Sequence, residues 1–205
     1  MGIYKTKSEA LFERFCSSNG LRFDVIEETD SSTPDYALEI GKTKYIVEVK
    51  QIDEDENYKK YDTANGGGGG GLRTPGSHVR AKIKNARNQV RKASENGIPT
   101  ILLIHNNLDE FQIFGTEPND FLTGMYGEMT VTIILETDQV SHPFHGKNRT
   151  LREDTNTSFS AIGHLYIGKN GPGIHLYENM YAKVPIDFQN LPSCINWNRI
   201  AVAAN

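Results

Sequence analysis

Cysteine is scarce in this chain, and long apolar runs are missing. Two cysteines, Cys16 and Cys194, among 205 residues exclude a disulfide scaffold and a four-cysteine zinc site. No stretch of about eighteen consecutive apolar residues occurs, which is the length that a transmembrane helix requires. The lysines near the start, Lys5 and Lys7, have no apolar segment of the secretion-signal type behind them. We therefore expect a cytoplasmic protein without a membrane span.

The chain also lacks a positive net charge. It carries 22 lysines and arginines against 26 aspartates and glutamates, which gives a formal net charge of -4. Nucleic acid would therefore have to be bound by a local cluster of basic side chains, not by the chain as a whole. With 205 residues, of which 23% are charged, the composition predicts one folded domain over residues 1–205 with a sizeable core.

Residues 33–50 predict a β-hairpin. Two runs rich in β-branched and aromatic residues flank the Gly41-Lys42 dipeptide, which suits a two-residue turn. Counting equally outward from this turn places Asp35 opposite Glu48, and Lys50 shares the face of Glu48 because side chains alternate along a strand. We expect this face to be exposed. The other face is predicted to be apolar and consists of Tyr36, Leu38, Ile40, Tyr45, Val47 and Val49.

The opposed carboxylates of Asp35 and Glu48 predict a cation between them. At roughly 5 Å between Cβ atoms two carboxylates repel each other unless a positive charge intervenes. Mg²⁺ or Mn²⁺ suits such a pair, because hard cations take a few carboxylate oxygens and leave other positions to water and phosphate. Lys50 could then polarise the attacking water in phosphodiester cleavage. Alternatively, Asp35 caps a turn, and Glu48 and Lys50 belong to the wet face of an antiparallel sheet.

The Pro34-Asp35 dipeptide followed by Glu48-Val49-Lys50 resembles the signature of the PD-(D/E)XK nuclease superfamily. The resemblance implies an α/β fold with a restriction-endonuclease-like core in the order helix, three-strand meander, helix, strand. Residues 1–110 can be assigned to that core, with a Gly-rich loop at 53–78, and residues 111–205 to a β-rich C-terminal elaboration. The resemblance covers roughly the first half of the chain.

The first helix is predicted over residues 8–19, with Thr6 or Ser8 as its cap and an apolar stripe that includes Phe12. The resemblance implies that a glutamate of this helix, three residues before an apolar anchor, joins the metal site, and Glu9 before Phe12 fits. Alternatively, Glu9 only favours the positive end of the helix dipole. Glu13 is predicted to point toward solvent.

A second amphipathic helix is predicted over residues 79–95, because apolar residues recur there at spacings of three and four. A basic stripe beside the apolar one predicts contacts with nucleic-acid phosphates and consists of Arg80, Lys84, Arg87 and Arg91. Alternatively, the stripe is an ordinary solvated helix face. On the opposite flank the resemblance implies Lys82 and Gln89 as auxiliary site residues.

The remaining segments predict strands and loops. An apolar run over residues 99–105 is typical of a central strand, and further strands are expected at 131–135, 160–167 and 174–177. Six consecutive glycines at 66–71 predict either a lid or a plain connector. His105 and His164 are interpreted as core histidines. Pro143 argues against a zinc site built on His142 and His145.

Together these patterns predict a metal-dependent nuclease that hydrolyses phosphodiester bonds, with DNA as the expected substrate and Mg²⁺ or Mn²⁺ as cofactor. Asp35, Glu48 and Glu9 would hold the metal ion, and Lys50 would position the attacking water. The alternative is a non-catalytic nucleic-acid-binding or interaction protein that retains the fold. The sequence leaves open RNA or DNA, one strand or two, and a homodimer.

Overall fold

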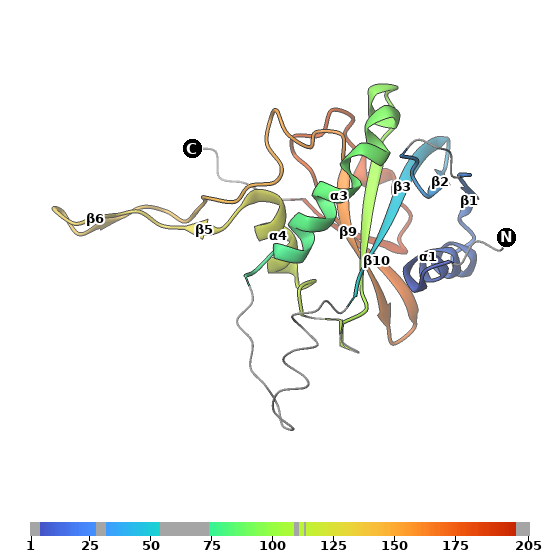
Figure 1. Cartoon of the computed structure of the whole chain (residues 1–205), viewed down its shortest axis with the longest axis horizontal. Helices are drawn as coiled ribbons and strands as arrows, with labels where there is room; N and C mark the ends of the chain where they lie inside the picture. The colour runs from blue at the N-terminus through green and yellow to red at the C-terminus, as the bar shows by residue number, and fades with distance from the viewer. Residues whose placement is uncertain (1–4, 28–31, 54–73, 109–110, 113, 200–205) are drawn as a thin grey trace.

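The computed structural model describes residues 5–27, 32–53, 74–108, 111–112 and 114–199 (Figure 1). Most of the glycine-rich segment at 53–78 lies outside these residues. The helices of the described chain are α1 (Lys7–Ser18), α3 (Ser77–Glu95), α4 (Pro118–Tyr126) and the short 3-10 helix η1 (Phe188–Asn190). The larger strands are β1 (Arg22–Val25), β2 (Tyr36–Ile40), β3 (Thr43–Ile52), β4 (Thr100–Asn106), β9 (Ala161–Gly168), β10 (Gly171–Glu178) and β11 (Ile195–Asn198).

These strands form one seven-stranded mixed sheet in the order β1-β2-β3-β4-β9-β10-β11. Neighbours are antiparallel from β1 to β3 and between β9 and β10, and they are parallel at β3–β4, β4–β9 and β10–β11. The expected α/β class is confirmed. The C-terminal half is β-rich, as expected, and it continues the same sheet because β9 pairs directly with β4.

The predicted hairpin register is confirmed. Tyr36 pairs with Val47 and Ile40 pairs with Thr43, so every pair is equally spaced about the turn at Gly41 and Lys42. The predicted apolar side chains of this hairpin are all buried in one cluster with the apolar stripe of α1. That stripe contains Phe12, which makes ring contacts with Tyr36 at a centroid distance of 4.7 Å.

The opposite face of the sheet is also covered, which differs from the expectation. Helices α3 and α4 pack on it, and a second apolar cluster forms between them and the strands. Val79, Ile83, Ala86 and Val90 of α3 are fully buried there. Ile52 of β3 belongs to this cluster, so the strand that carries Glu48 has apolar packing on both sides. A sheet flanked by helices on both faces is the arrangement that buries such strands.

Residues 129–145 form a ribbon outside the main sheet. Here β5 (Met129–Thr130) pairs with β8 (Phe144–His145), and β6 (Ile133–Ile134) pairs with β7 (Gln139–Val140). The strand expected at 131–135 is therefore wrong in length, since only two of its residues are paired. Pro143 in the returning segment has no N–H to donate to a ladder, which limits continuous pairing. None of the described helices is long and apolar enough to cross a membrane.

The packing of α3 against α4 predicts a difference between two glycines with left-handed backbone. Gly76 (φ 72°) precedes α3 and Gly97 (φ 77°) follows it. A Cβ at Gly76 would lie 2.4 Å from the backbone nitrogen of Gly124, whereas a Cβ at Gly97 would meet nothing within 4 Å. Gly97→Ala should cost about 1–2 kcal/mol of unfolding free energy through its positive φ alone. Gly76→Ala should cost clearly more in urea titrations, and equal losses would contradict the close approach of the helices.

Candidate functional site

An open hollow of about 480 Å³ lies beside the carboxyl end of β3 and the start of α1. Polar side chains from three elements and the loop before β2 line it. They are Thr6, Ser8, Glu9, Ser32, Thr33, Asp35, Lys50, Gln51, Asp53 and Gln89, together with Val49. The structure therefore brings Asp35, Lys50, Glu9 and Gln89 of the predicted site together around one space.

Asp35 is held across the hairpin by the main chain. Its Oδ2 accepts a hydrogen bond of 2.7 Å from the Val49 N–H, and its carbonyl accepts one of 2.9 Å from the Ile26 N–H. Regular pairing of β2 with β3 ends at Tyr36 and Val47. Beyond this pair the Asp35 carboxylate accepts the hydrogen bond that a backbone carbonyl of β2 would otherwise accept. The side chain is thereby fixed next to the strand segment that carries Glu48 and Lys50.

Glu48 is buried completely, with an exposed fraction of 0%, and this corrects the expectation of an exposed carboxylate. The reason is the docking of α3 over its face of the sheet. Oε1 forms an ion pair with the Lys50 ammonium, and neither carboxylate oxygen has a hydrogen bond of regular geometry to another described residue. Burial raises the pKa of Glu48 to about 7, the Asp35 charge raises it as well, and Lys50 lowers it.

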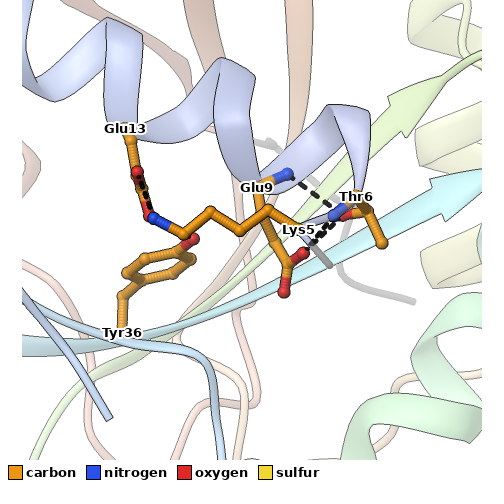
Figure 2. Close-up of polar contacts among 5 residues, drawn as sticks. All are labelled: Lys5, Thr6, Glu9, Glu13 and Tyr36. Carbon is orange, nitrogen blue, oxygen red and sulfur yellow. Dashed lines mark hydrogen bonds and ion pairs between the residues drawn. The ribbon is translucent and has the colours of Figure 1, made fainter. Parts of the chain in front are cut away.

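Glu9 belongs to the N-terminal cap of α1 and also lines the hollow (Figure 2). Its Oε2 accepts hydrogen bonds from the Thr6 N–H at 2.5 Å and from the Thr6 hydroxyl at 2.8 Å. The Glu9 N–H donates back to the Thr6 Oγ1 at 3.2 Å, which completes a capping box. The structure thus gives Glu9 a capping role, and its role as a metal ligand stays a prediction.

Glu13 is not the solvent-facing residue that the helix periodicity predicts. The Tyr36 hydroxyl donates to its Oε1 at 3.0 Å, and the Lys5 ammonium donates to its Oε2 at 2.8 Å (Figure 2). Burial raises the pKa of Tyr36, and the hydrogen bond with Glu13 raises it further. Glu13 therefore ties α1 to β2, because a tyrosine on the covered sheet face is long enough to reach the flank of the helix.

A hydrogen-bonded group at the ends of β3 and β4 was not predicted from the sequence. Asp53 Oδ1 accepts from the Gln51 amide at 2.6 Å and from the Asn107 amide at 2.8 Å. The Ser8 N–H of α1 donates to Gln51 Oε1 at 3.0 Å. Polar residues that directly follow two neighbouring parallel strands meet at one edge of the sheet, and this pattern could have identified Asp53 and Asn107.

The two flanks of α3 have different environments. Gln89 lines the hollow, as expected for the flank that it shares with Lys82. Burial lowers the pKa of Lys82, and the neighbouring Lys50 charge lowers it further, whereas Asp53 raises it. The structure therefore places Lys82 within the electrostatic reach of the hollow.

The basic stripe lies on the other flank of α3, so it does not border the hollow. Arg80 donates to the carbonyl oxygens of Pro75 at 3.0 Å and Thr123 at 3.3 Å, and it links α3 to α4. Lys84, Arg87 and Arg91 are exposed and form no ion pair with any other described residue. At about 100° per residue, the flank with the basic stripe and the flank with Lys82 and Gln89 lie roughly 180° apart around the helix axis, with the apolar stripe between them.

The described histidines do not build a metal site. His105 is buried and its Nδ1 bonds the Leu165 carbonyl at 3.0 Å, so the interpretation as a core histidine is confirmed; burial lowers its pKa. Within the described residues, no group of three or more His, Cys, Asp or Glu side chains is arranged to hold a metal ion. Asp35 and Glu48 offer two carboxylates, and Mg²⁺ is commonly held by one or two of them together with water and phosphate.

Comparison of the chain with family models, with curated proteins and with solved structures gave no match.

The burial of Glu48 predicts how stability depends on pH in the absence of metal. The folded chain holds the Glu48 proton more tightly than the unfolded chain, with a pKa of about 7 against 4.5. Stability should therefore fall as the pH rises from about 4.5 to about 7, by on the order of 3 kcal/mol at most for this group. Glu48→Gln carries no charge and should remove that part of the decrease, so this variant should be more stable than wild type at pH 8 in urea unfolding.

The control for this measurement is Glu39→Gln on β2, which removes an exposed carboxylate from the same hairpin. It should follow the wild-type pH profile. A wild-type protein that gains stability relative to Glu48→Gln between pH 5 and pH 8 would contradict the buried, proton-binding carboxylate.

Proposed function

We propose that the chain is a metal-dependent nuclease, with Asp35, Glu48 and Lys50 as its central residues and DNA as its substrate. The observation that carries this proposal is the Glu48 carboxylate, which is completely buried next to Asp35 and, among the described residues, is paired with one ammonium group, that of Lys50. Burying a carboxylate without full hydrogen bonding is costly, and such groups with displaced pKa values concentrate at functional sites.

The order of elements supports a restriction-endonuclease-like core. Helix α1 is followed by the antiparallel strands β1, β2 and β3, then by α3, and then by β4 parallel to β3. This is the order that the Pro-Asp and Glu-x-Lys pattern implies. In this arrangement Asp35 directly precedes β2, the segment 48–50 lies on the neighbouring strand β3, and the first helix contributes to the rim of the hollow.

The residues of the site fit a hard divalent cation. Asp35 and Glu48 would hold Mg²⁺ or Mn²⁺, with Glu9 at the rim, because carboxylate oxygens are the ligands that such hard ions prefer. When bound, the ion would neutralise charge on the phosphate and favour a water-derived nucleophile. Lys50 would orient the attacking water and offset the charge that develops at phosphorus. To do so its ammonium would leave Glu48, whose Oε1 it contacts.

The substrate phosphates would meet two separate groups of cations. Gln89 lines the hollow, and Lys82 lies on the same flank of α3 within electrostatic reach of Asp53 and Lys50. Both would contact the phosphate next to the cleaved bond. Lys84, Arg87 and Arg91 lie on the far flank of α3 and would contact the backbone at some distance from the cleaved bond. Arg80 is already bonded to two carbonyl groups, so its main contribution is to join α3 and α4.

The alternative, a nucleic-acid-binding protein without catalysis, is favoured by one feature of Glu48. Its carboxylate oxygens are inaccessible to solvent, and the residue does not line the hollow. A closed ion pair between Glu48 and Lys50 could then be purely structural. The two functions differ in their response to metal ions.

Cleavage should be lost in variants of the three central residues. The assay offers plasmid, linear duplex DNA, single-stranded DNA and RNA to the protein in Mg²⁺ or Mn²⁺. Asp35→Asn, Glu48→Gln and Lys50→Ala should each reduce cleavage by about a hundredfold or more, since one charge-stabilising group commonly contributes that much. Asp35→Asn keeps a side-chain oxygen for the Val49 N–H and therefore tests the charge. The control is Lys44→Ala, an exposed residue at the other end of β3. Three variants that cleave like wild type would exclude this site.

Metal ions should stabilise the folded chain even without substrate. Binding of Mn²⁺ to the folded state alone should add about 2.7 kcal/mol to the unfolding free energy at a hundredfold excess over the dissociation constant. Thermal melts across a Mn²⁺ titration should show this rise for wild type and little of it for Asp35→Asn. A wild-type melting temperature that is indifferent to millimolar Mn²⁺ would favour the binding-only alternative.

A further inference from the structure

Residues 129–145 form an arm that projects away from the sheet and its helices (Figure 1). Its two halves pair near the body between Met129 and His145 and further out between Ile133 and Val140. The returning half contains one residue more than the outgoing half between these pairs, and Pro143 lies in that interval. A two-stranded ribbon of this kind is only marginally stable in water without packing on one face.

The outgoing half of the arm alternates between apolar and other side chains. The odd-numbered residues are apolar and exposed by 48% to 86%, and Val140, which pairs with Ile133, is exposed by 61%. These odd-numbered residues are Met129, Val131, Ile133 and Leu135. The even-numbered residues between them are Thr130, Thr132 and Ile134. Apart from Ile134, which is also apolar and exposed, this alternation is the pattern of a strand with one buried face, yet here the apolar face meets solvent.

Charge along the arm is divided between its two ends. Glu136 and Asp138 are exposed at the tip, and Lys147 and Arg149 are exposed where the arm joins the body, next to the half-buried Glu128. An acidic tip disfavours contact with nucleic acid, because phosphates would be repelled there. A second arm running in the opposite direction would instead place its basic end against this acidic tip.

We propose that two copies of this chain associate by packing the apolar faces of their arms against each other, antiparallel about a two-fold axis. In such an interface the same surface is used twice, so each acidic tip meets the basic end of the other arm. Each arm is roughly 25 Å long, which places the buried area at the low end for specific interfaces. The dimer should therefore dissociate on dilution through the micromolar range.

Sedimentation velocity over a concentration series of the full chain tests the apolar face. Wild type should show a concentration-dependent dimer, and Ile133→Thr with Val140→Thr should raise its dissociation constant at least tenfold while keeping β-branched side chains. Gln139→Thr, next to Val140 on the opposite face, is the matched control and should associate like wild type. A wild-type chain that stays monomeric at every concentration overturns the proposal.

A charge exchange tests the antiparallel arrangement and does not depend on the stability of the apolar variants. Glu136→Lys alone and Lys147→Glu alone should each weaken the dimer severalfold, because each places like charges together. The two changes combined in one chain should restore wild-type association. Effects that simply add in the combined variant would exclude antiparallel packing of the arms.

Discussion

The pairing of β3 with two different partners is the constraint on which the site depends. The first part of β3 pairs with β2, and its second part pairs with β4, with an overlap at Ile46 and Val47. Where β2 ends, the N–H of Val49 needs another acceptor, and the Asp35 carboxylate supplies it. One hydrogen bond thus completes the strand and brings a carboxylate beside Glu48 and Lys50. The Asp35 carboxylate therefore reaches the hollow because the pairing of β2 with β3 ends there.

Burial of β3 on both faces gives the site its electrostatic character. Helix α3 covers the face that carries Glu48, and the apolar stripe of that helix is complementary to the strands below it. The same docking places Gln89 at the hollow and keeps the basic stripe away from it. Helix α1 completes the rim through its capping box and through the Ser8 N–H that reaches Gln51. Two helices and one hairpin therefore determine which charges face the same space.

Sequence patterns predicted the features of this fold that depend on residues close together in the chain. The register of β2 and β3 follows from a turn and an alternation within residues 33–50, and both are visible in the sequence. The burial of Glu48 could not be predicted in the same way, because it depends on a helix that follows some thirty residues later. For the same reason the bond of Arg80 to the Thr123 carbonyl, the pairing of β9 with β4 and the contact of Glu13 with Tyr36 needed the folded structure.

The bond between the Val49 N–H and Asp35 Oδ2 also makes this backbone amide a reporter. Most strand amides bond to other backbone groups, so their resonance frequencies report on the pairing of the strands. This one bonds to an ionisable side chain, so its nuclear magnetic resonance frequency should respond to whatever approaches or protonates Asp35. A single assigned peak would then follow the state of the hollow without any label or substrate.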